Sequence, residues 1–350
     1  MPHMPRLPTL DSTLSLIKDP YQYLHKKSQQ LKSTIFETRI LLQRTIVMTG
    51  KEAAAMFYNT DLFQRADAAP GLLKATLFGE GAVQTLDDLP HKHRKSMFRE
   101  MMSEDRVKTL GLIFQSHFMA KLAKHRPFDK LVLYDELQKI LYDAAWEWTG
   151  ISHSEVDSKR HREEITALYD KAGRMGVHHL ESRLARKTSE RWVERMILDI
   201  RSGKLQVNSD LPAAKIANHR DLDGNLLDAR TAAVELINVI RPITAVSVYI
   251  VFVALALHDY PLAPNYLREE DRLESFVQEV RRYYPFFPAA IARVRKDFRS
   301  EGIDFDKGTR AMLDLYGTNH NESTWKDGDR FIADRFLTQK ISPYNFVPQG

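Results

Sequence analysis

The stretch from Ile243 to Leu257 constrains the fold most, because it contains no charged residue. A helix that is apolar on every side belongs in the centre of a large protein. A membrane span is the competing interpretation, but a bilayer requires roughly 18 to 20 consecutive apolar residues, and Arg241 and Pro242 interrupt the upstream side of this run. We therefore expect a buried central helix within Asp228–His258 and no transmembrane segment.

The composition describes a globular protein with a single domain over residues 1–350. With 43% apolar and 28% charged residues, the chain can bury a large core. A formal charge of +5 is mild for this length, and the basic residues are dispersed, which argues against a nucleic-acid partner. Met1 to Asp11 contains no apolar signal segment, so we expect a cytoplasmic protein.

Helical periodicity dominates the remaining sequence. Apolar residues recur at spacings of three and four, which is typical of amphipathic helices that pack on a core. We predict such helices at Asp88–His125, Leu131–Gly150, Ser154–Gly203 and Leu267–Tyr284, the last of them stopped by Pro285. Alternating stretches at Ile35–Gly50 and Phe298–Leu315 predict two small sheets. The fold class is therefore mainly α with two minor sheets.

Arg241 is the residue of the central helix that most needs a partner. A guanidinium keeps its proton in a protein, so a buried Arg241 requires an anionic or hydrogen-bonding group. Residue type alone favours an internal salt bridge with an aspartate or glutamate. Pro242 favours another interpretation, because its ring lacks an N–H, pushes against the carbonyl of Asn238 and should kink the helix there. A cationic fork beside a kink in an apolar wall would bind the carboxylate of a fatty acid.

A second group of motifs lies near the end of the chain. Glu279 and Arg282 share a helix face at a spacing of three, which alone is typical of a surface ion pair. They are followed by LDLYGTNH at 313–320, Trp325, DRFIADRF at 329–336 and PQG at 348–350. This order and spacing resembles the cytochrome P-450 superfamily, whose ExxR helix precedes a strand pair, a meander and a loop that carries the haem-ligating cysteine.

The resemblance covers essentially the whole chain and is specific to the bacterial fatty-acid peroxygenase branch. It rests on Arg241-Pro242 in the central helix, on QEVRRYYPF, and on the upstream stretches FYNTDLFQR, LFGEGAVQTLD and HKHRKSMF. It implies a cytochrome P-450-like helical fold with haem b as cofactor. It also implies hydroxylation of long-chain fatty acids at the alpha or beta carbon by hydrogen peroxide, without a reductase or other redox partner.

The resemblance assigns roles to individual residues. In that branch the arginine matching Arg241 pairs with the fatty-acid carboxylate, and Pro242 stands where other superfamily members carry an acid or amide. The bound carboxylate would then act as general acid and base toward the peroxide. Gln84 matches a distal position at which hydroxylating members resemble this chain, although a glutamine here is by residue type ordinary packing. The other pocket positions of the branch match Phe78, Phe287 and Pro288.

Further positions match residues that hold the cofactor or the fold. The cations that match partners of the haem propionates are Arg65, His91, Arg94 and Lys95, although residue type alone is equally consistent with a solvated surface. The residues that match the structural salt-bridge network of the superfamily are Glu279, Arg282 and Arg335. Their implied role is support of the fold and of the haem loop.

The chain departs from the superfamily in one respect, because it contains no cysteine. The superfamily ligates haem iron through a cysteine thiolate. We expect that the sequence is a truncated form whose ligand loop follows Gly350, so that no metal ligand lies in this chain. A polypeptide that ends at Gly350 should form no thiolate-ligated haem, show no peroxygenase activity, and expose an apolar floor that favours aggregation.

Two alternatives to the peroxygenase remain. One is a lipid-binding protein that keeps the Arg241 pocket without catalysis, which the coding sequence past Gly350 would test. The other is a reductase-dependent haem monooxygenase, which is disfavoured because no suitable acid precedes Thr244.

Overall fold

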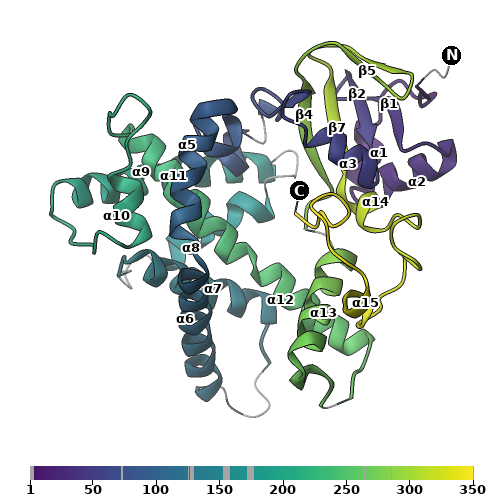
Figure 1. The fold of residues 1–350 in the computed structure, drawn as a ribbon. Coiled ribbons are helices and arrows are strands. Elements are labelled where there is room, and N and C mark those ends of the chain that lie inside the picture. The colour runs from purple at the N-terminus through teal and green to yellow at the C-terminus, as the bar shows by residue number, and fades with distance from the viewer. Residues whose placement is uncertain are drawn as a thin grey trace. The chain divides into compact units, whose positions relative to one another are not determined.

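The computed structural model describes residues 4–71, 74–124, 126, 130–152, 158–171, 177–263, 265–284 and 286–349. Contacts divide them into two compact units (Figure 1). Unit 1 comprises the described residues of 1–69 and 252–350, and unit 2 comprises those of 70–251. Pro285, which was predicted to stop a helix, and Gly350 lie outside the described residues.

The regular elements in the described part of unit 2 are helices, apart from an isolated bridge between Arg220 and Leu226. Its helices are η1 (Lys74–Phe78), η2 (Val83–Thr85), α5 (Asp88–Met101), α6 (Glu104–Ala123), α7 (Leu133–Thr149), α8 (Ser158–Asp170), α9 (Val177–Arg201), α10 (Pro212–Ala217) and α11 (Ala229–Ala245). The following helix, α12 (Ser247–Asp259), begins in unit 2 and ends in unit 1. The predicted helix at 131–150 is α7, the tract at 88–125 contains two helices, α5 and α6, and the described part of the tract at 154–203 also contains two, α8 and α9.

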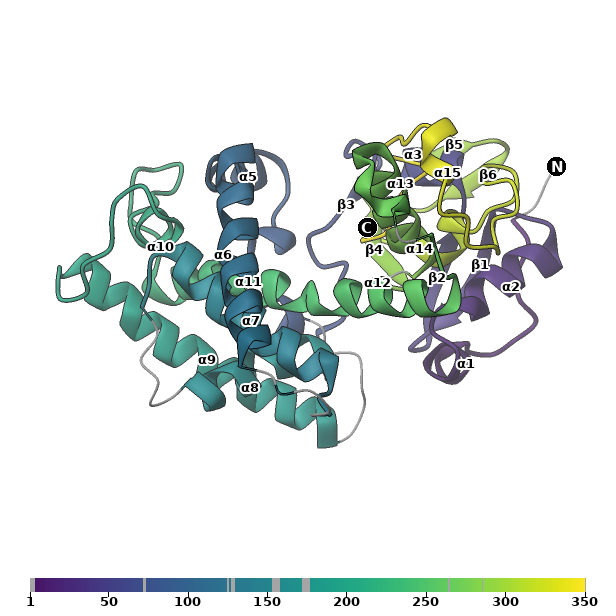
Figure 2. The same cartoon turned by 90° about the horizontal axis from the view of Figure 1, so that it is seen from below.

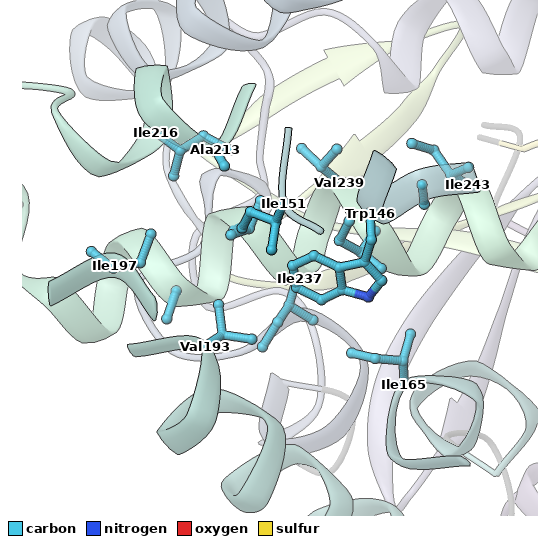
Figure 3. Packing of buried hydrophobic residues seen from close by; sticks show 14 of the residues in the cluster. Trp146, Ile151, Ile165, Val193, Ile197, Ala213, Ile216, Ile237, Val239 and Ile243 are labelled. Atoms are coloured by element: carbon cyan, nitrogen blue, oxygen red, sulfur yellow. The ribbon is translucent and has the colours of Figure 1, made fainter. Parts of the chain in front are cut away.

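The core of unit 2 forms around α11, which packs against α7, α8, α9 and α10. Ile237 and Val239 of α11 meet Trp146 of α7 and Val193 of α9 in one buried apolar cluster (Figure 3). Asp228 caps the first turn of α11 by accepting a hydrogen bond from the N–H of Thr231, at 3.0 Å. Almost every residue of α11 from Ala232 to Ala245 is buried.

One helical span, Ala229–Asp259, is long and apolar enough to cross a membrane, judged by length and composition alone over the described residues. The uncharged run Ile243–Leu257 is only part of this span, because α11 and α12 together extend it (Figure 2). Burial of α11 against four neighbouring helices is what a core helix of a globular protein shows.

The helix continues through Pro242. It ends at Ala245, and Val246 alone separates α11 from α12, so the break lies beyond the arginine rather than beside it. The Pro242 ring is exposed, whereas Ile240 and Ile243 on either side are buried in the core cluster. Packing of these neighbours holds the helical path despite the hydrogen bond that proline cannot donate.

Unit 1 is built on a five-stranded sheet with the order β1-β2-β7-β4-β3. The strands are β1 (Ile35–Ile40), β2 (Gln43–Met48), β3 (Phe63–Gln64), β4 (Ala289–Val294) and β7 (Arg310–Asp314). β5 (Phe298–Ser300) and β6 (Ile303–Phe305) form a separate two-stranded sheet. Two small sheets are thus confirmed, but β7 pairs in parallel with β2 and belongs to the larger one rather than to the second.

Helices cover this sheet and follow it. They are α1 (Thr13–Lys18), α2 (Gln22–Leu31), α3 (Lys51–Phe57), η3 (Tyr266–Arg268), α13 (Glu270–Tyr283), α14 (Leu315–Asn319) and α15 (Arg335–Thr338). α13 packs against α15, and Phe276 and Val280 of α13 form a buried cluster with Ala256 and Phe331. This packing places the charged face of α13 beside the segment that follows α14.

Candidate functional site

Arg241 is a buried cation without a carboxylate partner. Its side chain lies in the fourth turn of α11 and is only 5% exposed. One guanidinium nitrogen donates a long hydrogen bond of 3.5 Å to Oδ1 of Asn238, and Nε has no partner in the described part of the chain. Burial, followed by the charge of Arg186, lowers the pKa of Arg241 to about 9, so it remains a cation at neutral pH. The internal salt bridge that residue type favours does not form among these residues.

The acid nearest to Arg241 along α11 is Glu235, and it already has a partner. Its buried Oε1 accepts hydrogen bonds from Arg94 of α5, at 2.7 Å, and from the N–H of Val83, at 2.9 Å. Burial raises the pKa of Glu235 despite these bonds. Arg94, which the resemblance grouped with the propionate partners, therefore commits one nitrogen to an internal ion pair.

Asn238 connects the predicted distal residues to Arg241. Its side-chain Nδ2 donates to the carbonyl oxygen of Phe78, at 3.2 Å, and to Oε1 of Gln84, at 3.4 Å. Its Oδ1 is the acceptor of the Arg241 bond. The structure thus connects Arg241, Gln84 and the backbone of Phe78 through a residue to which the sequence interpretation gave no role. The available signal was its spacing of three from Arg241, which puts both on one helix face.

A buried ion-pair network occupies unit 1. The carboxylate of Glu279 accepts two hydrogen bonds from Arg282, at 2.7 and 2.8 Å, and two from Nε of Arg335, at 3.0 and 3.1 Å. It also accepts one from the N–H of Ile332, at 2.8 Å. Arg282 donates further to the carbonyl oxygens of Asn319 and Gly328. The three predicted residues therefore meet, and they tie α13 to the segment 319–335.

The remaining predicted residues of unit 1 lie beside the sheet. Arg65 donates to the carbonyl oxygen of Ile291 in β4, at 3.1 Å, and its guanidinium lies 4.3 Å from the ring centroid of Phe57. Phe287 is half-buried against the core of unit 1, and the carbonyl oxygen of Pro288 accepts a hydrogen bond from the N–H of Leu315. Their roles toward a haem propionate and a substrate channel stay predictions.

Two further candidates lie on α5 in unit 2. His91 is half-buried, whereas Lys95 is exposed. Both precede Met97, the first residue of α5 that joins the core of unit 2. An exposed lysine and a half-buried histidine fit either interpretation of this helix, so a propionate-binding role remains a prediction for both.

Asp314 is the buried acid of the LDLYGTNH stretch, and it should make stability depend on pH. It caps α14 through a 2.8 Å hydrogen bond from the N–H of Gly317, but burial raises its pKa from 3.8 to about 7. Because the folded state holds this proton more tightly than the unfolded chain does, protonated Asp314 favours folding. This contribution is fully present below the pKa of the unfolded chain and is lost as pH rises to about 7.

We therefore expect Asp314→Asn, which keeps the capping acceptor, to stabilise the protein by a few kcal/mol at about pH 8 and by little at about pH 4. Urea unfolding at both pH values measures this difference. Asp304→Asn, at an exposed acid of β6, is the control and should show no such pH dependence. An Asp314→Asn effect that is equal at the two pH values would contradict the prediction.

Comparison with known proteins adds a family to this geometry. The family model "Cytochrome P-450" matches residues 271–350. Human steroid 17-alpha-hydroxylase/17,20 lyase is 37% identical over 84 residues, which is 22% of this chain and 16% of that protein. Cytochrome P-450 4e2 of Drosophila melanogaster is 34% identical over 76 residues, which is 22% of this chain and 14% of that protein. The curated relatives are thus matched over less than a fifth of their length.

Solved structures match almost the whole chain. Cytochrome P-450SP alpha (CYP152B1), in complex with (R)-ibuprophen, is 41% identical with a TM-score of 0.93, covering 97% of this chain and 84% of that one. Cytochrome P-450EX alpha (CYP152N1), with myristic acid, is 38% identical with a TM-score of 0.94, covering 100% and 84%. Cytochrome P-450 OleT, in a complex with arachidonic acid, is 32% identical with a TM-score of 0.95, covering 99% and 84%. The chain therefore belongs to the cytochrome P-450 superfamily and, within it, to the CYP152 branch.

Proposed function

We propose that this protein serves the oxidation of long-chain fatty acids, with Arg241 as the receptor of the substrate carboxylate. The observation that carries the proposal is a guanidinium that is 5% exposed, has an unpartnered Nε and lacks an ion-pair partner in the described residues. A buried cation in this state is costly, and a carboxylate that binds both nitrogens of the fork relieves the cost. Two of the solved relatives hold myristic and arachidonic acid, which supports this class of ligand.

The proposed reaction is hydroxylation at the alpha or beta carbon with hydrogen peroxide as oxidant. An acid fixed by its carboxylate presents these two carbons nearest to Arg241. Pro242 has no group that can carry a proton, and Gln84 is a neutral amide, so neither supplies an acid or base. The bound carboxylate itself would then accept and return the peroxide proton. On this account no reductase is needed, and the cytoplasmic location and single domain remain predictions.

The residues of this chain do not provide the thiolate that a cytochrome P-450 haem requires. None of the 350 residues is cysteine, and the described residues contain no cluster of three or more His, Asp or Glu that could hold a metal ion. What these residues do is bind the acid, orient its carboxyl end and exclude water from Arg241.

A polypeptide of these 350 residues should bind myristic acid without oxidising it. When it is mixed with haem, reduced and exposed to carbon monoxide, we expect no thiolate-type absorption band, because no cysteine is present. Visible spectroscopy and mass spectrometry of the acid after addition of peroxide measure both outcomes. A thiolate-type band, or a hydroxylated acid, would contradict this expectation.

The oxidant is tested in haem-loaded protein that has a thiolate ligand. Hydrogen peroxide alone should convert myristic acid to its 2- or 3-hydroxy product. Product with NADPH and redox partners but none with peroxide would favour the reductase-dependent monooxygenase. Binding without product under either condition would favour the non-catalytic fatty-acid-binding alternative.

A further inference from the structure

A second buried guanidinium, that of Arg186 in α9, lies beside the Arg241 site. It is 2% exposed, and one of its terminal nitrogens donates to the carbonyl oxygen of Phe78, at 3.1 Å. Its Nε donates to Oε1 of Glu190, at 2.6 Å. The other terminal nitrogen has no hydrogen-bond partner within the described ranges. Arg186 therefore keeps a buried donor available, as Arg241 does.

The backbone next to Phe78 is shaped to this guanidinium. Gly79 has a φ of +84°, and a Cβ placed there would lie 2.0 Å from a terminal nitrogen of Arg186. Any other residue would be strained by its backbone conformation and would displace the guanidinium. Glycine at this position thus permits a close approach of the main chain to Arg186.

Arg186 and Arg241 are connected through one acceptor and one amide. The Phe78 carbonyl oxygen accepts hydrogen bonds from Arg186 and from Nδ2 of Asn238, and Oδ1 of Asn238 accepts from Arg241. The charge of Arg186 contributes to the lowered pKa of Arg241, after burial. The two cations therefore influence one another and share a hydrogen-bond connection through Phe78 and Asn238.

Arginines outnumber the carboxylates around Arg186 and Arg241. Glu190 accepts from Arg186 and also from Arg230, at 3.2 Å, so one buried carboxylate serves two guanidinium groups. Glu235 is taken by Arg94. Arg230 also lies 3.9 Å from the exposed carboxylate of Glu80. Four arginines thus face three glutamates, and one of the four, Arg241, has no ion pair in the described part of the unit. One additional carboxylate would balance the fourth arginine.

We propose that Arg186 is a specificity-determining residue of the Arg241 site, where it supplies a second positive charge for the substrate carboxylate and fixes the Phe78 carbonyl. The proposal rests on the function proposed above and deepens it, because two arginines, rather than Arg241 alone, would make the site prefer an ionised acid. A purely structural role, in which Arg186 only anchors the backbone at Phe78 and Gly79, predicts a different response to ligand charge.

The test compares myristic acid with 1-tetradecanol, which has the same chain length and no charge, by isothermal titration calorimetry. Arg186→Gln keeps an amide donor for the Phe78 carbonyl but removes the charge. We expect it to weaken myristic-acid binding about tenfold or more, since charge interactions are strong in a buried site, and to leave tetradecanol binding within about twofold. Arg186→Lys, which restores a charge, should recover most of the loss.

The matched control is Arg160→Gln. Arg160 is an exposed arginine of α8 that pairs with Glu164 at a spacing of four, as Arg186 does with Glu190. It should change neither affinity. Equal weakening of acid and alcohol by Arg186→Gln, or no weakening of the acid, would overturn the proposal.

Two further outcomes are decided in the same experiment. If Arg186→Gln does not fold, the test uses Arg186→Lys instead. Because lysine keeps the positive charge, the ratio of acid affinity to alcohol affinity should stay within about threefold of the wild-type ratio. A larger loss of this ratio overturns the proposal. If Arg241→Leu leaves acid binding intact, the proposed function itself fails. Acid binding that depends on Arg241 but not on Arg186 rejects only the role of Arg186.

Discussion

Replacing Arg241 by leucine should weaken the binding of long-chain fatty acids by roughly 30-fold to several thousand-fold, because loss of a buried charge partner costs about 2–5 kcal/mol. Leucine fills the apolar wall of α11 but offers no donor to the carboxylate. The fold should not suffer, since no carboxylate of the described residues depends on Arg241. Removal of a buried charge without an ion pair is neutral or stabilising. Calorimetric titration with myristic acid and thermal unfolding measure the two effects.

The controls for this variant separate charge from shape. 1-Tetradecanol should bind wild type and Arg241→Leu alike, because its hydroxyl does not require a cation. Arg241→Lys keeps the charge without the planar fork and should retain part of the acid affinity. Unchanged affinity of Arg241→Leu for myristic acid would remove the basis of the proposed function.

The burial of Arg241 was predictable from sequence, and its lack of an acid partner was not. The uncharged run after Pro242 places the arginine in a core helix by local pattern alone. Whether an acid reaches it depends on Glu235, which is occupied by Arg94, a residue 141 positions away in the chain. Such a pairing depends on how helices pack, and helical periodicity does not specify which helix covers which face.

The same limit applies to the sheet. The alternation at 298–315 correctly indicates strands, but one of the two partners of β7 is β2, more than 260 residues earlier, in a parallel register of Val47 with Met312. Local pattern predicts a hairpin for neighbouring strands, as with β5 and β6, and carries no signal for a parallel partner. Helix α11 shows the opposite case at Pro242, where tertiary packing overrides a local rule.

The resemblance, rather than the local pattern, grouped the site residues. Glu279 and Arg282 at a spacing of three are consistent with a solvated pair, yet both are completely buried, and Arg335 joins them from another helix. Gln84 and Phe78 likewise connect to Arg241 through Asn238. Asn238 and Arg186 have no distinctive motif, so neither local pattern nor resemblance selected them.

Glu279→Gln should destabilise unit 1 by about 3–5 kcal/mol, because it leaves two buried guanidinium groups without their shared carboxylate. The glutamine amide would also direct N–H donors at Arg282 and Arg335, which have no lone pair to accept them. The segment 319–335 depends on Arg282 through the carbonyl oxygens of Asn319 and Gly328, and on Arg335 through those of Asp327 and Arg330. We therefore expect the amide of Ile332, which donates to Glu279, to lose hydrogen-exchange protection first.

Glu269→Gln provides the matched control for this loss. Glu269 also pairs with an arginine three residues later, Arg272, at 2.9 Å, but both side chains are exposed. An exposed pair contributes about 0–1 kcal/mol, so this variant should unfold close to wild type. Chemical denaturation and hydrogen exchange of the two variants thus compare a buried ion pair with an exposed ion pair of the same spacing. Similar losses of stability in both variants would contradict the prediction. They would show that the carboxylate of Glu279 does not hold the segment 319–335, and that the backbone carbonyls alone satisfy Arg282 and Arg335.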